Sequence, residues 1–366
     1  MPRKSTRRDF LLGKSAADAV GDLADGFASG ICPLEEPAGG AYLVHVARPA
    51  MAAQFELFFN AGQYEADLEA ALEALDLVES LEQQMTWFRD ASELSRINRS
   101  AAHEPVEVEP GLFALLQRSL ELSDQTGGAF DITAGPLWEV WGFSRRSGRI
   151  PTATELAQAR ESVGSHLVEL DSAARTVHFR KPGVRLNLGS IGKGYALDRS
   201  AEILAEKGIG DYLFHGGQSS VLARGTNIEA RLPQNDEGNP ASGWTVGLRH
   251  PLRRGDRLAQ IRLRDQSLAT SGTGVQFFWH QGKRYGHILD PRTGWPAEGL
   301  LSATVVAPNA TLSDALATAV FVMGAEQAFD FCADRPEIGL VLVLPAKSGG
   351  LEVKTAGLDE SQLIIS

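Results

Sequence analysis

Short apolar segments typical of strands alternate along this chain with segments whose apolar residues recur every three or four positions, and this mixture limits the fold more than any other feature. Residues 41–47 and 54–59 are short and apolar, as strands are. Residues 65–85 follow with helical spacing. The residues that carry this spacing are Leu68, Leu72, Leu75, Val78 and Leu81. The body of the chain is therefore expected to open with strands and an amphipathic helix.

The rest of the chain continues this mixture. A helix over residues 110–126 opens with Pro110 and stops at Gly127-Gly128, as the start and stop signals of helices predict. Further helices are expected over residues 152–163, 191–207 and 313–324, and strands over residues 166–171, 176–180, 184–188 and 337–345, with short glycine-separated strands from Asp211 onward. These elements predict an α+β protein, a single compact unit of mixed sheets flanked by helices, with one lobe or two left open.

The chain divides into a leader and a folded body. Residues 1–40 are expected to form a leader and linker, because Pro33, Pro37 and Gly39-Gly40 break regular structure. Residues 41–366 then form the domain. Arg7-Arg8 lies in a segment similar to a twin-arginine export signal, but the acidic residues that follow are unlike the apolar core of a signal peptide. Export is weakly favoured, with a flexible basic start and a cytoplasmic protein as the alternative.

Composition argues against two classes of protein. The 46 acidic residues exceed the 35 basic ones and give a formal charge of -11, whereas proteins that bind nucleic acid need a basic face. No stretch approaches the roughly 20 apolar residues that span a bilayer, so no transmembrane segment is expected. The cysteines Cys32 and Cys332 form no zinc-ligand set. Any phosphate chemistry must therefore rely on a local cation or a metal ion.

Residues 186–198 are the strongest functional signal. A strand is expected to end and a helix to begin near Ile191, an arrangement that offers free backbone amides to an anion. Lys193, between Gly192 and Gly194, adds a mobile positive charge that can approach a phosphate closely. The segment is not a P-loop, because glycine rather than serine or threonine follows the lysine. A tight turn without a ligand is the alternative.

Two further segments carry polar residues suited to ligands. Asp131 and Thr133 would share one side of an extended segment, although a packed loop with a satisfied aspartate is slightly favoured. Asp314 and Thr318 stand four residues apart on an expected helix, and hence on one face. A carboxylate and a hydroxyl there could hold a hard cation. From spacing alone, a role for Asp314 as a helix cap is favoured.

A fourth segment combines a histidine with a tight turn. His287 lies on an expected strand, just before residues 290–294, whose Asp-Pro-Arg-Thr-Gly sequence is typical of turns. A histidine beside exposed polar groups suits a general acid or base, and a structural histidine is the alternative.

Taken together and in this order, these segments resemble the ApbE family, the FAD:protein FMN transferases. The resemblance spans residues 51–324, most of the chain. Its specificity comes from motifs in register: the turn of residues 85–98, the FDIT and WGF block of residues 128–143, the NLGSIGKGYALD block of residues 187–198, Gly216-Gly217, Thr270-Ser271-Gly272, the HILDPRTGWP block of residues 287–296 and the DALATA block of residues 314–319.

The resemblance implies that FAD is the substrate and Mg²⁺ the cofactor, and that FMN moves to a threonine hydroxyl of a partner protein with release of AMP. It implies catalytic roles for His287, Lys193 and Asp314. It also implies metal ligation by the main-chain oxygen of Ser190 and by Asp314 and Thr318. Such residue types suit phosphate transfer, because magnesium and lysine neutralise charge that develops on phosphate. The implied FAD contacts are Met51, Trp87, Ala129, Phe130, Asp131, Asn187, Lys193 and Ile288.

The sequence departs from the family at two positions. The family often has aspartate at the position of Asn187, which can still form a hydrogen bond to the flavin or ribose but cannot act as an acid or base. Many members have a second aspartate at the position of Ala317, and its absence leads us to expect weaker metal binding here. Hydrolysis of FAD to FMN and AMP, an FAD pyrophosphatase activity, would use the same metal and lysine and stays open. A non-catalytic FAD-binding protein is a third hypothesis, against which the retained lysine, histidine, aspartate and threonine argue.

Overall fold

The computed structural model describes residues 31–32, 43–227, 243–253, 255–274, 276–346, 349–359 and 361–365. Within the predicted leader and linker, Ile31–Cys32 form a short strand, β1, that pairs with β9 (Trp244–Arg249). The Arg7-Arg8 motif lies outside the described residues, so export stays a prediction.

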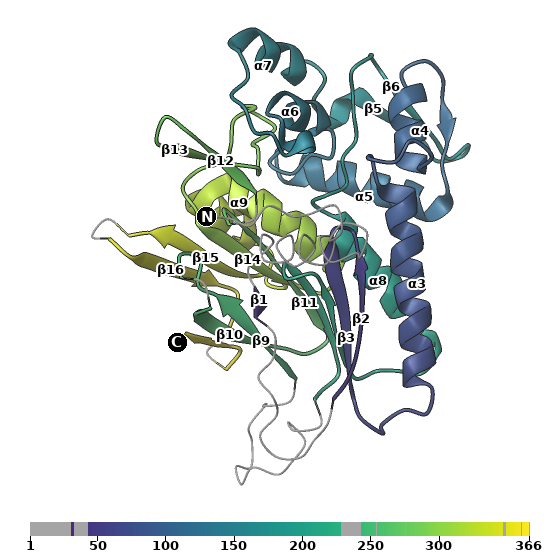
Figure 1. The fold of residues 1–366 in the computed structure, drawn as a ribbon, viewed down its shortest axis with the longest axis vertical. Helices are drawn as coiled ribbons and strands as arrows, with labels where there is room; N and C mark the ends of the chain where they lie inside the picture. The colour runs from purple at the N-terminus through teal and green to yellow at the C-terminus, as the bar shows by residue number, and fades with distance from the viewer. Residues whose placement is uncertain are drawn as a thin grey trace, which may run out of the picture.

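An eight-stranded antiparallel sheet forms the centre of the molecule (Figure 1). Its order is β16-β15-β14-β11-β8-β7-β3-β2, which makes neighbours of strands that are distant in sequence. The central strands are buried along nearly their whole length because other layers cover both faces. The strands are β2 (Leu43–Ala50), β3 (Ala53–Asn60), β7 (Tyr212–Gly216), β8 (Ser220–Arg224), β11 (Gln266–Gly272), β14 (Ser302–Ala307), β15 (Gly339–Pro345) and β16 (Leu351–Ala356).

Three helices cover one face of this sheet: α3 (Asp67–Met85), α8 (Gly192–Glu206) and α9 (Ala310–Ala333). The structure confirms the helix predicted from apolar spacing in α3, but Leu68 and Leu72 of that stripe are exposed. Small residues such as Ala71 and Ala74 form much of the buried face instead, together with Leu75 and Val78. Their small side chains allow α3 to lie close to its neighbours.

The opposite face of the sheet packs against a second, four-stranded sheet. Its order is β1-β9-β10-β17, with β10 at Arg257–Leu263 and β17 at Leu363–Ile365. Trp244 and Ile261 from this sheet share a buried apolar cluster with Leu213 and Val221 from the central sheet. The body is thus built of three layers, helix on sheet on sheet.

A smaller, mostly helical lobe lies beyond one end of α3 and α9 (Figure 1). A two-stranded hairpin, β12 (Phe277–His280) and β13 (Lys283–Gly286), stands beside it. These elements confirm the predicted α+β class. The lobe contains α4 (Glu93–Ser100), α5 (Pro110–Gln125), α6 (Gly135–Val140), α7 (Ala153–Arg160), the 3₁₀ turns η1 (Phe143–Arg145) and η2 (Ser165–Leu167), and a sheet of β4 (Val106–Glu107), β6 (Thr176–Phe179) and β5 (Val168–Asp171).

The strand predicted over residues 184–188 is wrong. This segment is extended, but it makes only an isolated bridge between Arg185 and Ala134. Its backbone groups bond elsewhere, because the amide of Asn98 accepts from Leu186 N at 2.7 Å and donates to Leu186 O at 3.0 Å. A side chain therefore replaces the neighbouring strand that a ladder would need.

α9 continues beyond the predicted end at Gly324. This glycine adopts φ 76° and ψ 176°, outside the helical region, and the helix resumes after the kink. By length and composition alone, α9 is apolar enough to cross a membrane. Half of its most apolar window is buried inside the protein, where α9 packs on α8, β11 and β14. That packing is what a core helix of a globular body shows.

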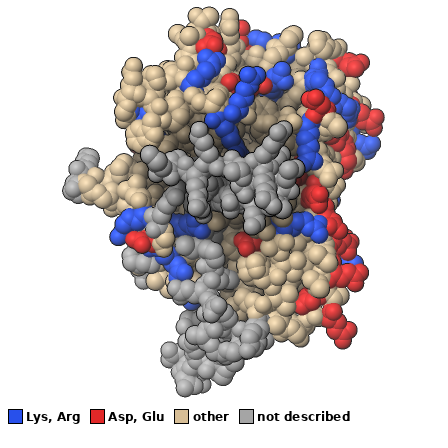
Figure 2. Space-filling model, viewed as in Figure 1, with Lys and Arg blue, Asp and Glu red and all other residues tan. Residues whose placement is uncertain are grey.

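The charge of the chain is unevenly distributed over its surface. Figure 2 shows acidic side chains along the edge that α3 occupies and basic side chains gathered over the smaller lobe. The formal charge of -11 is therefore not spread evenly over this face of the molecule.

Candidate active site

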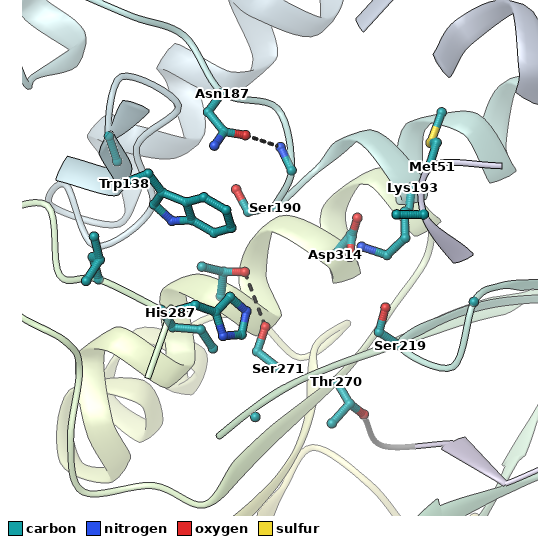
Figure 3. Close-up of a pocket in the computed structure, with 18 of the residues that line it drawn as sticks. Met51, Trp138, Asn187, Ser190, Lys193, Ser219, Thr270, Ser271, His287 and Asp314 are labelled. Carbon is teal, nitrogen blue, oxygen red and sulfur yellow. Dashed lines mark hydrogen bonds and ion pairs between the residues drawn. The ribbon is translucent and has the colours of Figure 1, made fainter. Parts of the chain in front are cut away.

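A cavity of about 260 Å³ opens where the start of α8, the first half of α9, the start of β8 and the end of β11 meet (Figure 3). It brings together segments that are far apart in sequence. Most of the residues predicted from the family resemblance line it, namely Met51, Ala129, Asp131, Asn187, Ser190, Lys193, His287, Ile288, Asp314 and Thr318.

Two predicted residues lie elsewhere. Trp87 lines an adjoining cavity of about 230 Å³, which shares Met51, Asn187 and Lys193 with the first. Phe130 lines neither cavity, because its side chain is buried in the core with 1% of its surface exposed. The prediction of an FAD contact thus has no support from the placement of the Phe130 ring.

Asp314 is the buried carboxylate of this cavity. Its Oδ2 accepts from Gly194 N at 3.0 Å, and its Oδ1 accepts from Ser220 Oγ at 2.9 Å. Lys193 Nζ lies 3.9 Å from the same Oδ1. The favoured interpretation from spacing, a helix cap, is wrong. Asn309 caps α9 by accepting from Leu312 N, and Asp314 lies within the helix.

The glycine after Lys193 serves packing rather than access to a phosphate. A Cβ atom on Gly194 would lie 2.1 Å from the main-chain oxygen of Ala310, far inside contact distance. Gly194 therefore permits the close approach of α8 to α9, which puts Lys193 next to Asp314 (Figure 3).

The amides at the start of α8 are less free than the sequence indicates. Gly192 N donates to Leu188 O at 2.8 Å, and Gly194 N donates to Asp314. The side chain of Lys193 is consequently the main anion-binding group that this segment offers.

Thr318 lies one turn beyond Asp314 and faces the same cavity. Its hydroxyl is 3.2 Å from Ser271 Oγ, and Ser271 comes from β11. Ser219 also lines the cavity, at the start of β8. This wall therefore presents several oxygen atoms around one carboxylate.

His287 lines the same cavity in a defined tautomer. Its Nδ1 lies 3.0 Å from Gln276 O, which can only accept, so Nδ1 carries the proton and Nε2 of the neutral ring keeps a lone pair. Burial of the ring lowers the pKa of His287 to about 4, and the positive charge of Lys193 acts in the same direction. The ring is neutral near neutral pH.

Asp131 and Thr133 form a turn rather than one side of an extended segment. One oxygen of Asp131 accepts from Thr133 N at 2.7 Å and from Thr133 Oγ1 at 2.6 Å, and the other accepts from Ser165 N at 3.1 Å. Burial raises the pKa of Asp131. The packed loop with a satisfied aspartate is the arrangement observed, although Asp131 also lines the cavity.

Asn187 keeps a potential donor for a ligand. Its Oδ1 accepts from Gly189 N at 2.8 Å, whereas its Nδ2 has no hydrogen-bond partner within the described part of the chain. An aspartate at this position would present only acceptors. The amide therefore changes the polarity of this corner of the cavity.

Several cavity residues were not predicted from the sequence. Trp138, whose ring centroid lies 6.0 Å from that of His287, is one of them. Ser219 lines the cavity and Ser220 donates to Asp314; both follow the Gly216-Gly217 motif, and small polar residues after a buried strand and a glycine turn were the available signal. Gln218 and Ser271 also line the cavity.

A buried carboxylate, a lysine, several hydroxyls and a neutral histidine that line one cavity are the groups of an enzyme that acts on a phosphate-containing ligand. The model of the ApbE family matches residues 51–342. The chain therefore belongs to the ApbE family, as the motifs predict.

Known relatives agree with this assignment. Proteins named FAD:protein FMN transferase from Haemophilus influenzae and Treponema pallidum are 30% and 33% identical to this chain, covering 80% and 77% of it and 83% and 79% of their own lengths. The solved flavin transferase ApbE from Vibrio cholerae is similar with a TM-score of 0.75 at 27% identity, over 86% of this chain and 97% of that one. The ApbE protein from Thermotoga maritima has a TM-score of 0.74 at 29% identity, over 85% and 96%.

Proposed function

We propose that this chain transfers FMN from FAD to a threonine hydroxyl of a partner protein, in a magnesium-dependent reaction that releases AMP. It is an enzyme of the ApbE family, whose relatives are named FAD:protein FMN transferase. The observation that supports the finer statement is that Lys193, Asp314, Thr318 and the neutral ring of His287 all line one cavity.

The two adjoining cavities together suit FAD. Lys193 belongs to both, so a pyrophosphate bound at its ammonium group could send one ring system into each cavity. The rings of Trp87 and Trp138, whose centroids are 6.5 Å apart, provide flat apolar surfaces of the kind that stack on aromatic ligands. Met51 and Asn187 also line both cavities.

The residues present fit a magnesium ion that also binds the phosphates of the substrate. No three His, Cys, Asp or Glu side chains converge anywhere in the part of the chain that the structure describes, so an all-protein cage is absent there. Magnesium is usually held by one or two carboxylates together with substrate phosphates. Asp314, Thr318 and the main-chain oxygen of Ser190 would hold it here. When bound, it supplies charge neutralisation at the pyrophosphate and the leaving AMP.

Ala317 bears on the expected metal affinity. Its side chain is buried in the core with 1% of its surface exposed, and it does not line the cavity. The wall of the cavity therefore does not lose a ligand at this position. We infer that Ala317 affects metal binding less than the family comparison implies.

The transfer can be written with the groups of this chain. The threonine oxygen forms a bond to the phosphorus of the FMN half, the bond from that phosphorus to the bridging oxygen breaks, and AMP leaves with the bridging oxygen. In this proposal His287 accepts the threonine proton at Nε2, and the contact of its Nδ1 with Gln276 O supports this choice because it leaves Nε2 unprotonated. Asp314 is a poorer candidate for this role, because both of its oxygens already accept hydrogen bonds. Lys193 adds positive charge beside the phosphates.

One incubation tests the proposal against its alternatives. The full chain is incubated with FAD, Mg²⁺ and a threonine-bearing fragment of a candidate acceptor. The mass of the fragment is then measured by mass spectrometry, and AMP is measured by chromatography. A fragment heavier by one FMN, formed together with AMP, supports transfer. AMP with free FMN and an unmodified fragment supports hydrolysis instead. Bound FAD that stays intact supports a non-catalytic binding protein.

A further inference from the structure

Asp198 of α8 caps the start of α9. Its Oδ1 accepts from Ala310 N at 2.8 Å, and its Oδ2 accepts from Thr311 N at 2.7 Å and from Thr311 Oγ1 at 2.6 Å. The side-chain oxygen of Asn309 accepts a hydrogen bond from the next amide, Leu312 N, at 2.9 Å. The first amides of α9 are therefore satisfied, two of them by a carboxylate from another helix, at the end of a helix that attracts negative charge.

A second hydrogen-bonded contact also joins α8 to α9. Four residues earlier on α8, Gly194 N donates to Asp314, which lies four residues later on α9 than Ala310. The two contacts are thus one helical turn apart on both helices, which pass each other in opposite directions. A change at the Asp198 contact shifts α9 along or away from α8, and the position of Asp314 relative to Lys193 shifts with it.

We propose that Asp198 is a positioning residue of the active site, because it holds α9 in the register that brings Asp314 and Thr318 into the cavity beside Lys193. Asp198 itself lines a separate cavity on the other side of α8, so it acts through α9 and does not touch the substrate. The proposal rests on the metal-binding roles proposed above for Asp314 and Thr318, but its geometric part can be measured without catalysis.

The substitution Asp198→Asn tests it in the full chain. An amide has one acceptor oxygen, so its NH₂ group must face an amide of α9 that now has no partner. We expect hydrogen exchange at Gly194 N to accelerate by roughly 10-fold or more, and Mn²⁺ added with FAD to bind roughly 10- to 100-fold more weakly, the loss typical for groups that orient metal ligands. Asp265→Asn is the matched control. Asp265 lines the same separate cavity and accepts from Gly225 N, but the structure records no bond from it to α9.

The outcomes separate this role from general stability. A purely structural role lowers the melting temperature of Asp198→Asn and leaves Gly194 exchange and Mn²⁺ binding at wild-type values, and that result overturns the proposal. Equal losses in Asp265→Asn overturn it as well. If Asp198→Asn does not fold, Thr311→Val removes one of the three hydrogen bonds and is judged by the same two measurements. If wild type binds no Mn²⁺, the proposed metal role fails, and Gly194 exchange alone still decides whether Asp198 sets the register.

Discussion

His287 shows how one hydrogen bond defines the chemistry of a residue. The bond from Nδ1 to Gln276 O leaves Nε2 as the acceptor, and burial keeps the pKa near 4. The ring therefore stays neutral at pH values where an ordinary histidine gains a proton. We predict that protonation of His287 does not lower kcat/KM for FAD between about pH 7.5 and 5.5, although an unperturbed histidine titrates near 6.5. A pH profile of kcat/KM with an inflection near 6.5 that disappears in a His287 variant contradicts the prediction.

The substitution His287→Asn separates the base from the hydrogen bond. The amide nitrogen of asparagine can still donate to Gln276 O, but the side chain cannot take up a proton at neutral pH. We expect kcat to fall roughly 10²- to 10⁴-fold, the usual contribution of a general base, with FAD affinity nearly unchanged. Steady-state kinetics with a fixed acceptor, together with FAD titration, measures both quantities. A variant with wild-type kcat excludes His287 as the base.

At the scale of elements, the contact between α8 and α9 determines the site, and Gly194 is its closest point. A methyl group there would lie 2.1 Å from Ala310 O, whereas one on Gly192 would make ordinary contacts with Met85 Cε at 3.7 Å and Leu188 Cβ at 4.0 Å. Gly194→Ala should lower the free energy of unfolding by about 1–3 kcal/mol, as overpacking does. Gly192→Ala, the matched control, should be neutral or stabilising by up to about 1 kcal/mol. Chemical denaturation of both variants checks this, and equal stabilities would show that the helices are not closely packed here.

Local signals predicted most elements, and distant partners explain those that differ. The helices α3, α5 and α8 carry apolar spacing or start and stop residues within their own segments. Residues 184–188 are not a strand because their hydrogen bonds go to Asn98, which is 88 residues from Leu186. The role of Asp314 likewise depends on Gly194 and Ser220, which lie 120 and 94 residues away. No local pattern contains that information, and the cavity residues were predicted through the family motifs instead.

At the scale of the whole molecule, buried neutral histidines link stability to pH. His215 of β7 is buried between the layers, its Nε2 has no hydrogen-bond partner among the described residues, and burial lowers its pKa to about 4. The unfolded chain binds a proton at higher pH than the folded one, so stability is lost as pH falls from about 6.5 toward 4, by up to roughly 3 kcal/mol for each such histidine.

Urea unfolding at several pH values measures this loss. His215→Phe should show a smaller dependence on pH than wild type, because one of the two groups with this lowered pKa, His215 and His287, is then absent. An unchanged dependence in the variant would assign the acid sensitivity to other groups.

The central claim is that Asp314 and its neighbours form the centre at which FMN is transferred. The most direct measurement is the mass of a threonine-bearing acceptor after incubation with FAD, with and without Mg²⁺, using wild type and Asp314→Asn. Asparagine keeps the shape of the buried side chain and removes its charge, so the fold should persist. We predict one added FMN with wild type and Mg²⁺, none without Mg²⁺, and a rate lower by more than about 100-fold in the variant, beyond the effect of groups that merely orient a metal ligand. Acceptor modified at the wild-type rate by a folded Asp314→Asn variant would contradict the claim.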